Sequence, residues 1–135
     1  MRPSRIVWEP TPVAFLRARD EPAAITHAWQ LLEDAVGDLR GRRFFGVVEP
    51  SGAEYHVCVA LRIDDDPSTW GLEIGTIPGG LYRRVRLQGE PPEIYERIAP
   101  TMAELEASTD RDDERPLVEF YRRRDEIDLL VPARA

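Results

Sequence analysis

One stretch of the chain repeats apolar residues with the period of an α-helix. Between Pro22 and Gly37 an apolar side chain recurs every three or four positions, at Ile25, Ala28, Trp29, Leu32 and Val36. This spacing lines them up as one stripe that could pack on the rest of the protein. Proline suits the first turn of a helix and glycine the position after its end. The pattern therefore predicts a helix that begins near Pro22 and ends at Gly37.

A second helical pattern follows Glu90-Pro91-Pro92. Apolar residues at 94, 98, 102 and 105 fall on one side of the expected helix. Pro100 lies inside this pattern. Proline has no backbone N–H and its ring crowds the preceding turn, so we expect Pro100 to kink or split the helix.

Shorter runs rich in β-branched and aromatic residues predict strands. The predicted strands cover 13–19, 44–48, 55–62, 81–87, 117–121 and 127–131. Pro50-Ser51-Gly52 predicts a hairpin turn between the second and third of them.

The predicted order strand–helix–strand–strand occurs twice. Glu21-Pro22 matches Glu90-Pro91, Val48-Glu49 matches Val118-Glu119, and 59–62 matches 131–134, at offsets between 69 and 72 residues. We therefore predict pseudo-repeats over approximately 5–63 and 73–135 within a single domain of 1–135. The predicted fold class is α+β. Two β-α-β-β units form one antiparallel sheet, with both helices on one face and a ligand groove between them.

Composition restricts the class of partner. The chain has 18 basic and 25 acidic residues among 135, a formal charge of −7 that repels phosphate backbones and disfavours nucleic acid. Two basic clusters, 83–86 and 122–124, are interpreted as solvated strand ends. No apolar run approaches the roughly 20 residues of a membrane span, and the N-terminus lacks the apolar core of a signal peptide. We expect a cytoplasmic, stand-alone domain with neither a nucleic-acid nor a membrane partner.

The residues that usually hold metals and cofactors are few. Cys58 is the only cysteine and lies in an apolar run, where we expect a buried small side chain rather than a reactive thiol. His27 and His56 are the only histidines, and their spacing to carboxylates predicts no metal site. Gly79-Gly80 precedes a strand, whereas phosphate-binding glycine loops precede helices. We therefore expect no metal and no cofactor.

Four motifs in the second half occur in a recognisable order. They are Ile77-Pro-Gly-Gly-Leu-Tyr82, Gly89-Glu-Pro91, Leu117-Val-Glu-Phe-Tyr121 and Leu130-Val-Pro132. Together they resemble the GyrI-like small-molecule-binding domain, which also forms the effector-binding half of AraC-type and MerR-type multidrug regulators. The chain departs from that family at Glu90-Pro91-Pro92, where an aromatic residue is usual.

Glu119 is the foremost candidate for a functional residue. Side chains alternate along a strand, so Glu119 and Tyr121 share one face. Burying an unpaired carboxylate costs several kcal/mol, so a buried Glu119 would need a tyrosine hydroxyl or a cationic ligand as its partner. From spacing alone, an exposed strand residue opposite an arginine is an equal alternative. The resemblance implies a glutamate inside the drug pocket and flat, apolar cations as a common ligand class.

Aromatic residues could line that groove and stack on a planar or cationic ligand. The candidates are Trp29, Tyr55, Trp70, Tyr82, Tyr95 and Tyr121. Tyr82 and Tyr121 are preferred because their strands should be central, and Tyr55 follows by pseudo-symmetry. Trp29 fits a core position equally well. Glu49 is expected to be exposed at a turn, so it does not form an acid–base pair with Glu119.

Three function classes remain open. The first is binding of hydrophobic small molecules, cationic ones among them, for sensing or sequestration. The second, implied by the resemblance, is hydrolysis of strained cyclopropane-type natural products, with Glu119 as general base and Tyr121 or Tyr82 polarising the leaving oxygen. The third is a protein interaction of the gyrase-inhibitor kind.

Overall fold

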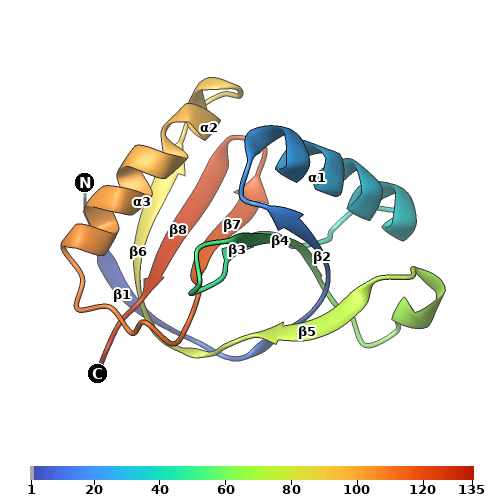
Figure 1. The fold of residues 1–135 in the computed structure, drawn as a ribbon, viewed down its shortest axis with the longest axis horizontal. Coiled ribbons are helices and arrows are strands. Elements are labelled where there is room, and N and C mark those ends of the chain that lie inside the picture. The colour runs from blue at the N-terminus through green and yellow to red at the C-terminus, as the bar shows by residue number, and fades with distance from the viewer. Residues whose placement is uncertain (1) are drawn as a thin grey trace.

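The computed structural model describes residues 2–135, which form one curled antiparallel sheet with its helices on one face (Figure 1). The strands are β1 (Ser4–Trp8), β2 (Thr11–Arg19), β3 (Phe44–Val48), β4 (Glu54–Ala60), β5 (Glu73–Ile77), β6 (Gly80–Gln88), β7 (Leu117–Arg123) and β8 (Glu126–Pro132). The helices are α1 (Pro22–Val36), α2 (Glu93–Glu96) and α3 (Ile98–Ala107), with a short 3₁₀ turn at Pro67–Thr69. The predicted α+β class is confirmed.

The eight strands lie in the order β1-β6-β8-β7-β3-β4-β2-β5. The first half of the chain supplies β3-β4-β2 and the second half supplies β7-β8-β6, so the halves meet where β3 pairs with β7. The two outermost strands are exchanged. β1 pairs with β6 of the second half, and β5 pairs with β2 of the first.

α1 forms as the apolar stripe predicts. Ala28 and Leu32 on this stripe are buried against the sheet. The helix ends at Gly37, whose φ of 83° lies in the left-handed region that glycine adopts without strain. The Gly37 N–H donates to the carbonyl of Glu33 and so satisfies one of the last carbonyls of the helix.

The second helix is broken, although the break lies before Pro100. α2 ends and α3 begins at Arg97, and Pro100 is the third residue of α3. The first turn of a helix leaves its N–H groups without partners inside the helix, so a proline there loses no hydrogen bond. Pro100 therefore starts a new helix after the break and does not interrupt one.

The two faces of the sheet bury separate clusters. On the helix-covered face, α1 packs on β2 and β4, while α3 packs on β6 and β8. The sheet curls around a second cluster on its helix-free face. That cluster contains Val13, Phe15, Phe45, Val47, Cys58, Ala60, Ile77, Tyr82, Val118 and Leu130. Trp8 from one edge strand packs against it, and Ile77 belongs to the other edge strand, so both edges help to close it.

One of the matches between the halves is wrong in register. Val48 packs with the clusters on the helix-covered face, whereas Val118 belongs to the helix-free cluster. Aligning Val48-Glu49 with Val118-Glu119 would therefore exchange the two faces of the sheet. In the antiparallel ladder that joins these two strands, Gly46 is opposite Glu119 and Val48 is opposite Leu117.

Within residues 2–135, no helix has the length and hydropathy needed to cross a bilayer.

Candidate functional site

Glu119 lies on β7, where the two halves of the sheet meet. α1 and α3 cover the strands on either side, so β3 and β7 run between the two helix-covered regions (Figure 1). Glu119 points to the helix-covered face and is only 8% exposed. Tyr121 shares this face, as strand alternation predicts.

Two tyrosine hydroxyls donate hydrogen bonds to the same oxygen of Glu119. Tyr55 from β4 and Tyr121 from β7 each approach Oε1 at 2.6 Å, and their two hydroxyl oxygens lie 3.3 Å apart. Within residues 2–135, Oε2 accepts no hydrogen bond, and no arginine or histidine forms an ion pair with Glu119. The site is thus a buried carboxylate with one oxygen bonded to hydroxyl donors and the other without a partner in the chain.

A glycine provides the space for this cluster. Gly46 lies directly opposite Glu119 on β3. A β-carbon at position 46 would lie 1.8 Å from the hydroxyl oxygen of Tyr55 and 2.8 Å from Oε1 of Glu119. Neither distance is compatible with a real side chain. Gly46 is therefore the residue that lets the tyrosine and the carboxylate meet.

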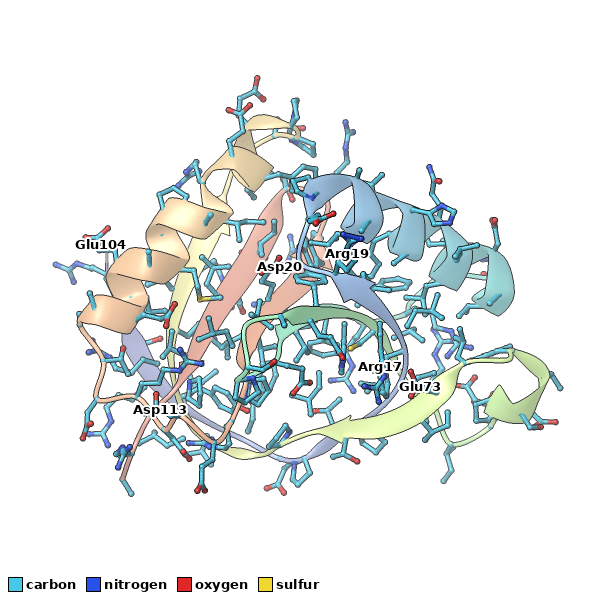
Figure 2. The ribbon with its side chains drawn as sticks, in the orientation of Figure 1. Arg17, Arg19, Asp20, Glu73, Glu104 and Asp113 are labelled. Carbon is cyan, nitrogen blue, oxygen red and sulfur yellow. The ribbon has the colours of Figure 1, made fainter. Side chains whose placement is uncertain are left out.

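Burial controls the ionisation of the cluster. Removal from water raises the pKa of Glu119, and the nearby charge of Asp20 raises it further, while the bonds from the two tyrosines oppose the shift. Asp20 lies at the turn before α1 (Figure 2). Burial, followed by the charge of Glu119, raises the pKa of Tyr55 and of Tyr121 well above the usual tyrosine range. Both phenols therefore stay protonated and act as donors.

α1 adds an aromatic cover to the cluster. The ring of Trp29 meets the ring of Tyr121 edge-on at 5.5 Å and that of Phe44 at 6.2 Å. Trp29 is partly buried, so one part of the indole packs on the site while another part reaches solvent. This arrangement places aromatic faces and edges around a carboxylate.

No protein-family model and no curated protein matches the sequence. Solved structures do match, over nearly the whole chain. An integron cassette protein from the mobile metagenome of Vibrio cholerae, VCH_CASS2, is 12% identical with a TM-score of 0.76, over 98% of this chain and 95% of its own. SAV2435 bound to tetraphenylphosphonium is 14% identical with a TM-score of 0.71, over 100% and 95%. The EcmrR C-terminal domain is 12% identical with a TM-score of 0.66, over 97% and 96%. The protein has a GyrI-like fold.

Three of the aromatic candidates lie apart from Glu119 in this GyrI-like fold. Tyr82 is fully buried on the opposite face of the sheet, and its hydroxyl donates to the carbonyl of Pro78. Its strand, β6, lies next to the edge strand β1 and is not central as expected, and its position in the alternation directs the ring into the helix-free cluster. Tyr95 lies on α2 and is 48% exposed. Trp70 packs beside α1, with the guanidinium of Arg42 5.3 Å from its ring centre.

Glu49 is not a simple exposed turn residue, contrary to the prediction. It lies 3.2 Å from Nδ1 of His56, and Glu54 lies 2.9 Å from Nε2 of the same ring. His56 stacks on Phe15, on the helix-free face and away from Glu119. His27 is exposed on α1. Within residues 2–135, no three histidine, cysteine or acidic side chains are placed to hold a metal ion.

The carboxylate of Glu119 has little exposed surface, since the residue is only 8% exposed. Two cavities, of about 440 and 590 Å³, lie around Leu81, Ala133 and Arg134 at another part of the sheet, and neither is lined by Glu119. The GyrI-like fold thus presents the carboxylate between its helices beneath packed aromatic rings.

Gly46 and Phe44 complete this arrangement, and neither was among the predicted site residues. A lone glycine inside a strand is the available signal for Gly46, since it often marks a close approach of another group.

Proposed function

We propose that this protein binds small apolar cations at Glu119. The observation that carries the proposal is a buried carboxylate with no cationic partner in residues 2–135 and with Oε2 free of hydrogen bonds. A buried charge without a counter-charge is costly. A cation that enters the site would supply the missing counter-charge. Removal of the cost of the unpaired charge would then add to the binding free energy.

The surroundings of the carboxylate suit an apolar cation better than a hydrated metal ion. Trp29, Tyr55 and Tyr121 present aromatic surface, and cations with aryl or alkyl groups gain both burial and cation–π attraction there. The fold neighbour SAV2435 has been solved bound to tetraphenylphosphonium, a cation of this class. This comparison supports the ligand class and leaves the particular ligand open.

Because Glu119 is only 8% exposed, a ligand that carries aryl groups must displace part of its cover to reach the carboxylate. Trp29 is the cover residue that is already partly exposed and is carried by a helix rather than by the sheet. We therefore expect Trp29 to move when a cation binds. Its indole would then report binding as a change in fluorescence.

Calorimetric titration with tetraphenylphosphonium tests the proposal. The matched control ligand is tetraphenylborate, which has the same shape and the opposite charge. We expect the cation to bind and the anion not to bind. Glu119→Gln should weaken the cation by about tenfold or more, since it removes a Coulomb attraction to a buried opposite charge, and about 1.4 kcal/mol of that attraction corresponds to one factor of ten.

Glu104→Gln is the matched control variant. Glu104 is exposed on α3, away from the cluster, and its substitution removes the same charge from the surface (Figure 2). It should leave the affinity unchanged. Equal affinities in Glu119→Gln and the wild type would rule out the carboxylate as the cation site.

The hydrogen bonds favour binding over hydrolysis. A tyrosine that polarises a leaving oxygen needs a hydroxyl free to donate to it, whereas Tyr121 and Tyr55 both donate to Glu119. Tyr82, the other residue considered for that role, lies on the opposite face of the sheet. Nothing in the geometry favours a gyrase-inhibitor role over ligand binding or hydrolysis.

A further inference from the structure

Two cavities lie away from Glu119, at the end of the sheet where the C-terminus lies (Figure 1). One of them, of about 440 Å³, opens where β1, β6 and the C-terminal residues meet. It is lined by Pro3, Arg5, Leu81, Arg83, Asp110, Ala133 and Arg134. Three arginines thus converge on one cavity in a protein whose overall charge is −7.

Two of these arginines lack a carboxylate partner. Arg5 and Arg83 are directly opposite each other on the antiparallel strands β1 and β6, so their side chains leave the sheet on the same face. Within residues 2–135, the side chain of Arg5 makes no hydrogen bond or ion pair, and the side chain of Arg83 donates only to the backbone carbonyl of Ser108. Like charges directly opposite each other destabilise a sheet, and no acidic side chain offsets this pair.

The third arginine is only partly neutralised. Arg134 lies 3.8 Å from Asp110 and 3.8 Å from Asp113, and these carboxylates are 85% and 78% exposed. Water screens such exposed pairs, so they contribute little. The cavity lining carries three positive groups against the single carboxylate of Asp110.

The rest of the lining is apolar. Pro3, Leu81 and Ala133 provide this surface beside the guanidinium groups. A guanidinium has five donors in a planar fork that matches carboxylate and phosphate oxygens, and the single bond from Arg83 to Ser108 leaves most of its donors free.

We propose that this cavity is a second ligand site, which binds a small oxyanion carrying an apolar group, such as an aryl phosphate or aryl carboxylate. Arg5 and Arg83 hold the anionic head between them, and Arg134 closes the third side. The apolar body rests on Pro3, Leu81 and Ala133. The site is independent of Glu119 and selects the opposite charge.

Phenyl phosphate is a suitable probe, observed by NMR through the side-chain Nε–Hε signals of the arginines and the backbone amides of β1 and β6. We expect saturable shifts at Arg5 and Arg83. Inorganic phosphate should bind more weakly because it lacks the ring, and phenol should not bind. Equal affinities for phenyl phosphate and inorganic phosphate would overturn the role of the apolar lining.

Substitutions locate the site. Arg5→Gln and Arg83→Gln should each weaken phenyl phosphate by about fivefold or more, because each removes charge-assisted bonds to the anion. Arg5→Gln is the safer variant for folding, since the side chain of Arg5 makes no hydrogen bond or ion pair within the described chain. Arg40→Gln is the matched control, because Arg40 is 92% exposed on another part of the surface and its loss changes the net charge equally.

Unchanged affinity in both Arg5→Gln and Arg83→Gln, or equal weakening in Arg40→Gln, would overturn the proposal. Glu119→Gln should leave phenyl phosphate binding intact, so this result separates the anion site from the cation site.

Discussion

At the scale of single residues, the centre of the candidate site is a pair of residues, one from each half of the chain. Gly46 from the first half provides space, and Glu119 from the second half provides charge. Alternation along one strand predicts that Glu119 and Tyr121 share a face, since that rule needs no knowledge of the partner strand. The expectation that this face looks into the molecule needed the family resemblance as well. Tyr82 was misplaced because its face depends on how its strand pairs with β1 and β8. The role of Gly46 depends on the same long-range register.

Gly46→Ala should damage stability and cation binding together. The added methyl would meet Tyr55 and force its hydroxyl away from Glu119, and overpacking of this kind costs about 1–3 kcal/mol. Urea unfolding measures the stability, and tetraphenylphosphonium titration measures the affinity. In a Tyr55→Phe background the nearest clashing atom is gone, so the same substitution should cost less. Equal costs in the two backgrounds would contradict the proposed contact.

The raised pKa of Glu119 predicts the direction of the pH dependence of cation binding. A cation binds the ionised carboxylate, and tetraphenylphosphonium keeps its charge at every pH. Affinity should therefore be full above the pKa of Glu119 and fall as the pH drops through it, and this pKa lies above the usual range for glutamate. Titrations across mildly acidic to neutral pH measure the profile. Glu119→Gln should give a flat profile, and a sloping one would assign the titration to another group.

At the scale of elements, the six predicted strands are all present, and the two that the sequence did not predict are the edges, β1 and β5. Each is five residues long and pairs with a strand from the other half of the chain. Local patterns report which residues alternate between faces, whereas edge pairing depends on contacts between residues far apart in the sequence. The same reason explains the faulty register between Val48 and Val118, which lie on opposite faces.

The position of Pro100 in the first turn of α3 makes it easy to replace. Pro100→Ala should change the free energy of unfolding by less than about 1 kcal/mol, because no hydrogen bond is gained inside the helix. Ala103→Pro, three residues later and also exposed, should destabilise by about 3 kcal/mol, since it removes an interior bond and crowds the preceding turn. Urea denaturation of both variants gives the comparison. A large loss in Pro100→Ala would mean that the proline itself maintains the break at Arg97.

At the scale of the whole molecule, the exchanged edge strands tie the two halves together. β1 belongs to the first half by sequence and completes the sheet of the second, while β5 does the reverse. Neither half can separate without losing an edge strand and opening the helix-free cluster, to which both halves contribute. The exchanged edge strands, at the two ends of the sheet, thereby stabilise the pairing of β3 with β7, the strands that carry Gly46 and Glu119.

This interlocking predicts a single cooperative unfolding transition. Trp8 on β1 packs on Phe45 of the first half and Tyr82 of the second. Trp29 on α1 packs on Phe44 of the first half and Tyr121 of the second, so each indole reports on whether the two halves stay together. In a Trp29→Phe, Trp70→Phe variant only Trp8 remains, and in a Trp8→Phe, Trp70→Phe variant only Trp29 remains. For each variant, urea unfolding followed by tryptophan fluorescence should superimpose on unfolding followed by circular dichroism. Comparison within one variant removes the effect of the substitutions on stability. If fluorescence of either indole changed before the loss of secondary structure, the halves would unfold separately, and the edge exchange would not couple them.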